Sequence, residues 1–401
     1  MLVLEYKAVV SKKQKLAINE AIRTTQFIRN KAIRYWMDAP KEAKINKIAL
    51  NNYSTALRKE FKFVEELNSM ACQSATERAW IAIDRFYSNC QSQKPGKKGF
   101  PRFQKDNRSV EYKTSGWSLH STKRRITFTD KKGIGEVKLL GKWDIHTYSV
   151  KSIKRVRILK RADGFYVQFC LAIEVQSEPR IADGEIGLDV GLEYFYSDSN
   201  GYHEPNPRFL KKAEKAIKYA QKQIYKKEKG RNQRRKARAR YARKHLRVNR
   251  QRSEHAKRVA RNVCKANALV VYEDLNVKNL VKNHCLAKSI NDVAWAAFRQ
   301  WLEYFAVKFG SWAVAVPPHY TSQKCSDCGA IVKKTLSTRT HKCSCGCELQ
   351  RDTNAAINIF NLGKNRLGHS RINATGDGTA TLLGATLVEQ VLSMNVESPR
   401  L

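Results

Sequence analysis

The sequence predicts an α+β protein of several domains, and three observations support this prediction. The chain has 401 residues, which is enough for two or three domains of ordinary size. Hydrophobic residues make up 42% of it and aromatic residues 9%, so real cores can form and wholesale disorder is excluded. The hydrophobic pattern changes along the chain from helical spacing to period two, and then to strands mixed with helices.

The first part of the chain predicts helices followed by a β domain. Residues 2–10 alternate loosely as in a short strand, and residues 12–89 keep helical spacing. Residues 94–105 (KPGKKGFPRFQK) contain two prolines and two glycines, which indicates a basic linker. From residue 110 to about residue 175 the pattern has period two, with a turn at 162–164, and predicts a small antiparallel β domain.

The second part predicts strands that alternate with helices. The first strand spans residues 186–192 (IGLDVGL), and further strands are expected at 268–272 and 312–316. Residues 295–307 predict an amphipathic helix. A last helix at 353–362 is expected to end at Gly363, because glycine is favoured just after helices.

The charge balance points to a polyanionic partner. There are 76 Lys and Arg residues against 36 Asp and Glu, and the formal net charge is +40. Self-repulsion on this scale opposes compaction unless a polyanion neutralises it, so nucleic acid is the expected partner. No membrane partner is expected, because the longest apolar stretches fall far short of the roughly 20 residues that a span requires. The N-terminus also lacks the apolar core of a signal peptide, which predicts a cytoplasmic protein.

Nearly half of this net charge lies in residues 208–260. This stretch holds 22 of the 76 Lys and Arg residues and only three Glu. It has no proline, and it predicts a long helix or a helical hairpin around Gly230. A solvated helix face is the alternative, but the acidic partners for intrahelical pairs are nearly absent. We therefore expect contacts with the phosphate backbone, with Arg234, Arg235 and Arg238 among the candidates.

The ten cysteines predict one metal site in a reducing compartment. Five are scattered singly, whereas the others include Cys325-Ser-Asp-Cys328-Gly and Cys343-Ser-Cys345-Gly, in which fourteen residues separate Cys328 from Cys343. Two such turns can form a closed tetrahedral site for one structural zinc ion. Such an ion would organise a segment too small for its own core. Cys347 is an alternative fourth ligand, although the Gly346 that follows Cys345 favours Cys345.

Three acids are candidates for a second kind of metal site: Asp189, Glu273 and Asp352. Each lies within or at the end of an apolar element, where an unpaired carboxylate is costly unless it binds a cation. Taken singly, a turn, an exposed strand end and a helix N-cap are sufficient explanations. Together they indicate a cluster that could hold two Mg²⁺ or Mn²⁺ ions about 3.5–4 Å apart, one activating water and one stabilising the leaving oxygen of a phosphodiester.

Several motifs, taken in order, resemble the OrfB/TnpB family of insertion-sequence proteins, the compact relatives of type V CRISPR effectors. They are RNKAIRYW, GKKGFPRF, GLDVGL around Asp189, VVYEDLN around Glu273, TSQKCSDCG, HKCSCGC and QRDTNAAINI around Asp352. This resemblance covers nearly the whole chain. Two departures are Gln350, where the family often has Asp, and the short second cysteine pair.

The resemblance implies an RNase H-like (RuvC-type) nuclease domain with a zinc-ribbon insertion, and a wedge-type antiparallel β-barrel that is interrupted by a helical recognition domain. Asp189, Glu273 and Asp352 would be the catalytic acids. The implied domains are the wedge (1–11 and 106–180), the helical recognition domain with its linker (12–105), the nuclease (181–320, including the insert 208–260, and 349–364), the zinc-ribbon (321–348) and a loose tail (365–401).

The resemblance also implies the partners. Such proteins bind a transposon-encoded guide RNA, one protein per RNA being favoured, and cut double-stranded DNA beside a short transposon-adjacent motif. Tyr53, Gln73 and Thr114 fall at places similar to those that read the motif in relatives, and Arg351 would hold phosphate. The hypothesis is therefore an RNA-guided, Mg²⁺-dependent DNA endonuclease. A guided repressor that does not cut, and a transposase that joins strands itself, are the alternatives.

Overall fold

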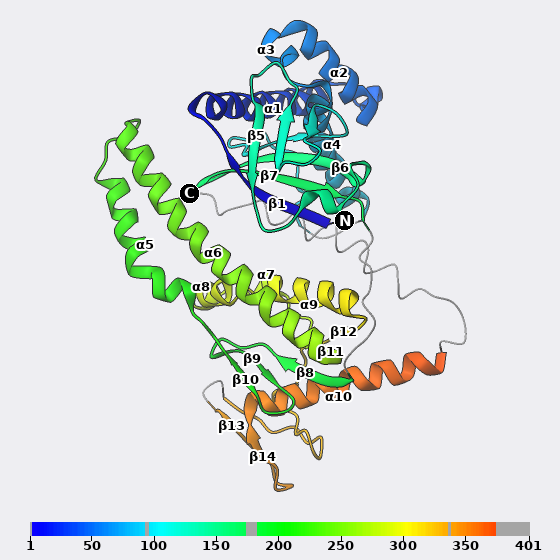
Figure 1. The fold of residues 1–401 in the computed structure, drawn as a ribbon. Helices are drawn as coiled ribbons and strands as arrows, with labels where there is room; N and C mark the ends of the chain where they lie inside the picture. Colours follow the sequence, from blue (N-terminus) through cyan, green and yellow to red (C-terminus); the bar gives the residue numbers. More distant parts are fainter. Residues whose placement is uncertain (1, 93–95, 174–182, 336–337, 374–401) are drawn as a thin grey trace. The chain divides into compact units, whose positions relative to one another are not determined.

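The computed structural model describes residues 2–92, 96–173, 183–335 and 338–373. It contains two compact units, residues 1–174 and 175–401, each with its own core (Figure 1). Residues 94 and 95 of the expected linker and residues 374–401 of the expected tail lie outside the described residues.

The first unit is built on a curled antiparallel sheet of seven strands. Its order is β2-β6-β7-β1-β5-β4-β3, so the N-terminal strand β1 lies in the middle and pairs with β7 on one side and with β5 on the other. The strands are β1 (Leu2–Val9), β2 (Ser109–Tyr112), β3 (Trp117–Leu119), β4 (Arg125–Phe128), β5 (Gly135–Leu140), β6 (Ile153–Arg161) and β7 (Gly164–Leu171).

The helices that follow β1 and precede β2 along the chain cover this sheet. Helix α1 begins with a capping box in which Ser11 accepts from the backbone of Gln14 and Gln14 accepts from the backbone of Ser11. The predicted helical spacing places Ile18, Ile22 and Ile28 in the core together with β-strand residues such as Tyr6. The helices are α1 (Lys12–Asp38), α2 (Lys47–Glu60), α3 (Lys62–Glu65) and α4 (Ser69–Gln91).

The second unit contains a mixed five-stranded sheet with the order β10-β9-β8-β11-β12. Strand β8 pairs antiparallel with β9, and β11 pairs parallel with both β8 and β12. The strands are β8 (Gly184–Asp189), β9 (Tyr194–Asp198), β10 (His203–Pro205), β11 (Asn267–Glu273) and β12 (Trp312–Val316).

Helices lie on both faces of this sheet, as the alternation along β11 requires. Val270 and Tyr272 pack with α6 (Asn232–Ala266) and α9 (Trp295–Phe309). Leu269 and Val271 face the other way, toward α10 (Arg351–Asn373). Figure 1 shows α10 on the opposite side of the sheet from α6 and α9.

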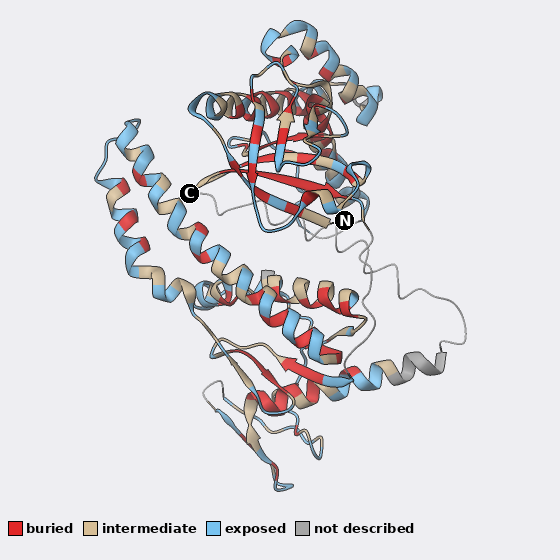
Figure 2. Ribbon diagram, viewed as in Figure 1, coloured by how far each residue is buried: buried red, intermediate tan, exposed pale blue. Residues whose placement is uncertain are grey.

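The basic stretch forms the expected helical hairpin. Helix α5 (Phe209–Tyr225) and helix α6 are joined by a turn in which Gly230 has φ +86°. Asp292 in α8 (His284–Val293) accepts from the backbone N–H of Leu210 at 2.9 Å and of Lys211 at 3.3 Å, which satisfies the start of α5. Exposed positions run along both helices in Figure 2.

The prediction that the last helix ends at Gly363 is wrong. Helix α10 continues through Gly363 to Asn373, into the segment expected to be a loose tail. Gly363 is needed for close packing, because a Cβ there would collide with Val271 of β11. Gly187 of β8 has the same role, since a Cβ at this position would collide with the main chain of Ala356 and with Phe360.

The remaining elements include a short hairpin and a short helix. They are α7 (Val277–Leu280), β13 (Thr340–Lys342) and β14 (Glu348–Gln350). None of the described helices combines the length and the apolar character that crossing a membrane requires.

Candidate active site and metal centre

Asp189 and Glu273 lie side by side at one edge of the second sheet. Strands β8 and β11 are parallel neighbours, with Leu188 paired to Tyr272, and each strand ends on the next residue. The carboxyl ends of parallel strands meet at the same edge, so both acids reach it together.

Asp352 reaches the same edge from the helix that covers the sheet. It is the second residue of α10, whose close approach to β8 is set by Gly187. Asp352 is 8% exposed, and the Arg351 guanidinium donates to its Oδ1 at 3.0 Å. The three acids predicted from the sequence therefore come from two strands and one helix to one place.

The electrostatics of this place disfavour bare carboxylates. Burial raises the pKa of the Asp189 carboxyl well above its usual range, and the neighbouring carboxylates of Glu273 and Asp352 raise it further. Burial also raises the pKa of Glu273, against the effect of a hydrogen bond from Thr321. Within the described residues, no hydrogen bond or ion pair to the Asp189 carboxylate is formed.

These residues fit hard divalent cations. Their donors are all oxygens, and cation charge would offset both the burial of Asp189 and its repulsion from the other two acids. In the described part of the chain, the three carboxylates do not form a group whose ligand atoms all lie within 4.8 Å of one another.

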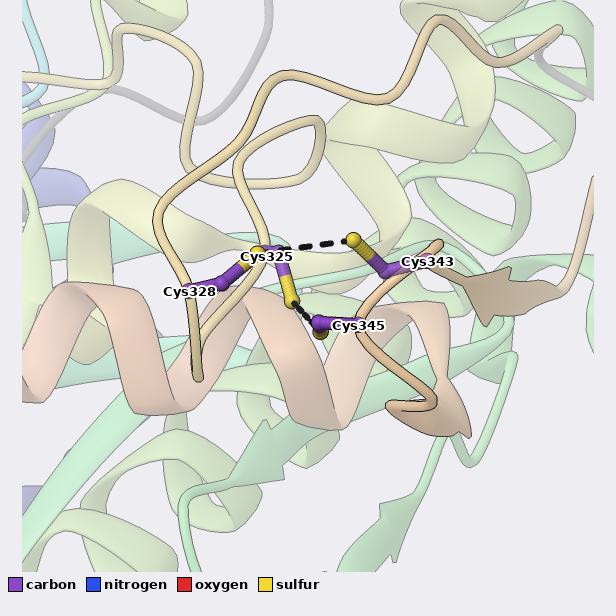
Figure 3. Close-up of side chains that lie close together, drawn as sticks. All are labelled: Cys325, Cys328, Cys343 and Cys345. Atoms are coloured by element: carbon purple, nitrogen blue, oxygen red, sulfur yellow. Dashed lines mark hydrogen bonds between the residues drawn. The ribbon is translucent and has the colours of Figure 1, made fainter.

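Four cysteines form a compact group suited to zinc (Figure 3). The sulfurs of Cys325 and Cys345 are 3.7 Å apart, and those of Cys328 and Cys343 are 3.5 Å apart. Sulfurs bound at about 2.3 Å to one tetrahedral zinc ion lie about 3.8 Å apart. Backbone N–H groups of Cys328 and Asp327 lower the pKa of the Cys325 thiol to about 5, as the tight turn predicts.

Cys347 lies in a different group. Together with Cys325 and His341 it forms a buried cluster whose ligand atoms are within 4.8 Å of one another. His341 contacts Lys334 through its Nδ1, and the ammonium of Lys334 donates to the carbonyl of Ser322 at 3.0 Å. The geometry therefore gives Cys345, not Cys347, to the four-cysteine group.

The sequence interpretation missed three residues around these sites: Thr321, Asn354 and Asn358. The Thr321 hydroxyl donates to the Glu273 carboxylate at 2.5 Å. Asn354 is fully buried and Asn358 is 7% exposed, and both bond the backbone that leads to Cys325. Two asparagines four residues apart on an otherwise apolar helix face were the available signal.

The proposed motif-reading residues all lie in the first unit. Tyr53 of α2 stacks on Tyr35, with ring centroids 4.3 Å apart. Gln73 of α4 accepts from Lys113 at 3.5 Å, and the exposed Thr114 follows that lysine directly. Gln73 thus contacts the residue that precedes Thr114 in the chain.

The three arginines of α6 differ in their surroundings. Arg234 donates to the carbonyl of Lys227 at 2.7 Å and lies over the Tyr225 ring, so it closes the hairpin. Arg235 and Arg238 are exposed. Arg351 is half-buried and also donates to the carbonyl of Thr338 at 3.2 Å.

Comparisons with known proteins show which families this chain resembles. Residues 168–284 match the OrfB_IS605 family model, described as "Probable transposase", and residues 295–359 match the model of the Cas12f1-like TNB domain. The resemblance to the OrfB/TnpB family is confirmed.

Two relatives match most of the chain, and a third matches a shorter part of it. A protein of Streptomyces pristinaespiralis, provisionally named an RNA-guided DNA endonuclease, is 25% identical over 93% of this chain and 90% of its own length. InsQ of Escherichia coli K12, with the same provisional name, is 27% identical over 73% of this chain and 78% of its own. A TnpB-like protein of Acanthamoeba polyphaga mimivirus is 34% identical over 22% of this chain and 18% of its own.

A solved structure shares the α+β fold. It is a Cas12f1 protein in a cryo-EM complex with sgRNA and target DNA, and it aligns with a TM-score of 0.50 at 14% identity. The alignment covers 87% of this chain and 81% of the Cas12f1 chain.

Proposed function

We propose that this chain is an RNA-guided DNA endonuclease that hydrolyses phosphodiester bonds with divalent metal ions. The observation that carries the proposal is the meeting of Asp189, Glu273 and Asp352 at one sheet edge, where burial and mutual repulsion leave Asp189 in need of a cation. The two relatives that cover most of the chain, which are provisionally named RNA-guided DNA endonucleases, support the same reading.

In this proposal the three acids hold two Mg²⁺ or Mn²⁺ ions between them. Ions bound there would activate water and stabilise the leaving oxygen of the cut strand. Asp189 and Glu273 contribute oxygens from adjacent strands, while Asp352 contributes from the helix start. Arg351 donates to the carbonyl of Thr338 and to the Asp352 carboxylate, and from there it would pair with a phosphate of the bound strand.

We assign the second unit to an RNase H-like (RuvC-type) nuclease and the curled sheet of the first to a wedge domain. The mixed sheet order, with its antiparallel and parallel halves, and the helices on both faces support the first assignment. The interruption of the first sheet by α1 to α4 between β1 and β2 supports the second.

Nucleic-acid partners are a guide RNA and a double-stranded target that carries a short adjacent motif. The hairpin of α5 and α6 offers exposed cations, including Arg235 and Arg238, that few acids neutralise. Tyr53, Gln73 and Thr114 are the candidates for reading the motif. Base pairing would supply the remaining specificity.

Cleavage by purified complexes tests the proposal. The wild-type protein with its copurified RNA should cut matching DNA in Mg²⁺, and Asp189→Ala should abolish cutting while RNA binding persists. Equal cleavage by Asp189→Ala would refute the nuclease assignment. Target binding without cleavage by the wild type would favour a guided repressor, and RNA-independent strand joining would favour a transposase.

A further inference from the structure

The loop that precedes the first zinc cysteine reaches the acid cluster directly. Thr321 is 7% exposed, and its hydroxyl donates to Glu273 Oε1 at 2.5 Å. The hydroxyl occupies one acceptor position of the carboxylate and leaves the remaining lone pairs for a cation.

The backbone of this loop is fastened to the helix that carries Asp352. Asn358 donates to the carbonyl of Thr321 at 2.9 Å and to that of Lys324 at 2.7 Å. Asn354 donates to the same Lys324 carbonyl at 2.8 Å and accepts from the backbone N–H of Ser326 at 3.0 Å. Two buried amides thus hold the segment from residue 321 to residue 326 against α10.

This segment ends inside the first cysteine turn. Ser326 lies between Cys325 and Cys328, so the Asn354 bond fixes the turn that would hold zinc. Asp352 is two residues before Asn354 on the same helix. A single hydrogen-bonded path therefore joins Glu273, Thr321, the cysteine turn and the start of α10.

We propose that Thr321 is a positioning residue that orients the Glu273 carboxylate for cation binding, and that the zinc-bound turn and the two asparagines hold Thr321 in place. This inference rests on the proposed function, since it assumes that the acid cluster takes divalent cations. Hydrogen-bond partners that orient a ligand commonly change metal affinity 10- to 100-fold when they are lost.

Side-chain substitution at Thr321 isolates this role. Asn358 bonds the main-chain carbonyl of Thr321, so the anchor of the loop remains when only the side chain changes. Thr321→Val removes the hydroxyl at nearly constant volume, and Thr321→Ser keeps it. Thr25→Val is a matched control, because Thr25 is a buried threonine of the first unit whose hydroxyl donates to the Ala21 carbonyl of its own helix.

The measurement is Mn²⁺ binding to the full-length, zinc-loaded protein, followed by the EPR signal of free Mn²⁺ without RNA or DNA. We expect Thr321→Val to bind Mn²⁺ about 10-fold more weakly or worse, with its zinc content unchanged. Thr321→Ser and Thr25→Val should bind as the wild type does. Wild-type affinity in Thr321→Val, or a loss in Thr321→Ser equal to that in Thr321→Val, would overturn the proposal.

A second experiment covers misfolding and separates the two proposals. If Thr321→Val does not fold, Thr321→Ala removes the same hydroxyl without adding a methyl group to the site. In a Glu273→Gln background the Thr321 substitution should have no further effect on Mn²⁺ affinity, and an undiminished effect would contradict action through Glu273. A protein whose Mn²⁺ affinity depends on the Thr321 hydroxyl but which does not cut DNA would retain this inference and lose the nuclease function.

Discussion

At the scale of single residues, Asp189 shows how a candidate functional site opposes stability. Its carboxyl is buried beside two other acids, and its pKa is raised by burial first and by Glu273 and Asp352 next. Buried, unpaired polar groups are costly, and proteins keep them where chemistry requires them. Folding of the metal-free chain is therefore expected to be weakened by this residue.

This reasoning predicts how stability depends on pH. Below the ordinary carboxyl pKa both the folded and the unfolded chain hold the proton, so the raised pKa costs nothing. As the pH rises, the unfolded chain releases this proton first and unfolding becomes easier. Metal-free wild type should thus lose stability toward neutral pH, and Asp189→Asn should be more stable at pH 7 by about 1 kcal/mol.

Thermal unfolding of metal-free proteins between pH 4 and 8 checks this prediction. The substitution Asp183→Asn, at an exposed acid of the same unit, serves as the control and should leave the profile unchanged. Mn²⁺ should stabilise the wild type at pH 7 and should do so much less in Asp189→Asn. Parallel pH profiles for wild type and Asp189→Asn would contradict the explanation.

The cysteines give a second prediction at this scale. Cys345 shares the four-sulfur group, whereas Cys347 belongs with His341 to a second group, and Cys325 is common to both. We expect Cys345→Ser to lose most of the bound zinc and Cys347→Ser to keep one ion per chain. Zinc content by mass spectrometry decides, with Cys285→Ser as an exposed control in the same unit. Zinc loss in Cys347→Ser alone would reverse the ligand assignment.

At the scale of elements, the sequence is most informative where the periodicity is strong. The strand at 268–272, the helix at 295–307 and the hairpin around Gly230 are confirmed within a few residues. The end of the last helix was missed, because Gly363 is a common helix stop and only the contact with Val271 shows its packing role. A contact between residues 92 positions apart leaves no local signal.

The candidate site follows the same pattern. The acids could be predicted because carboxylates in apolar strands are unusual, and the cysteines because their spacing is distinctive. Thr321 could not be predicted from the sequence, because its role depends on a hydrogen bond to Glu273, which lies 48 residues earlier in the chain. The order of strands in the second sheet likewise depends on pairing that the chain does not display locally.

Close packing of α10 gives the prediction at this scale. Alanine normally stabilises a helix by about 1 kcal/mol relative to glycine, but a Cβ at residue 363 meets Val271. We expect Gly363→Ala to destabilise the protein by about 1–3 kcal/mol, and to weaken Mn²⁺ binding by shifting Asp352.

The control is Asn361→Ala, at an exposed position of the same helix, which should be neutral or slightly stabilising. Unfolding midpoints of the two variants measure the difference, and a gain in stability in Gly363→Ala would show that the sheet and helix are not in close contact.

At the scale of the whole molecule, acidic side chains neutralise only part of the positive charge, and a net charge of +40 remains. Some cations are used internally, as where Arg155, Arg157 and Arg78 surround the buried Glu111. That carboxylate balances only part of their charge, and the hairpin of α5 and α6 has few acids at all. Most of the repulsion is therefore uncompensated in the free protein.

This imbalance predicts opposite effects of salt on the free and the RNA-bound protein. Screening shortens the range of charge interactions from about 10 Å at 0.1 M to about 3 Å at 1 M salt, so the melting temperature of the free protein should rise between 0.1 and 0.5 M KCl. RNA should raise it further at low salt, because the phosphates neutralise the same cations, and this gain should shrink as salt weakens binding. Differential scanning fluorimetry with and without RNA measures both trends.

Replacing Arg235 and Arg238 with Gln should reduce the gain in melting temperature from RNA, whereas Arg23→Gln should not, because Arg23 is already paired with Glu20. A free protein that melts at the same temperature at all salt concentrations would mean that the excess charge is neutralised within the fold, and nucleic acid would then no longer be needed to explain it.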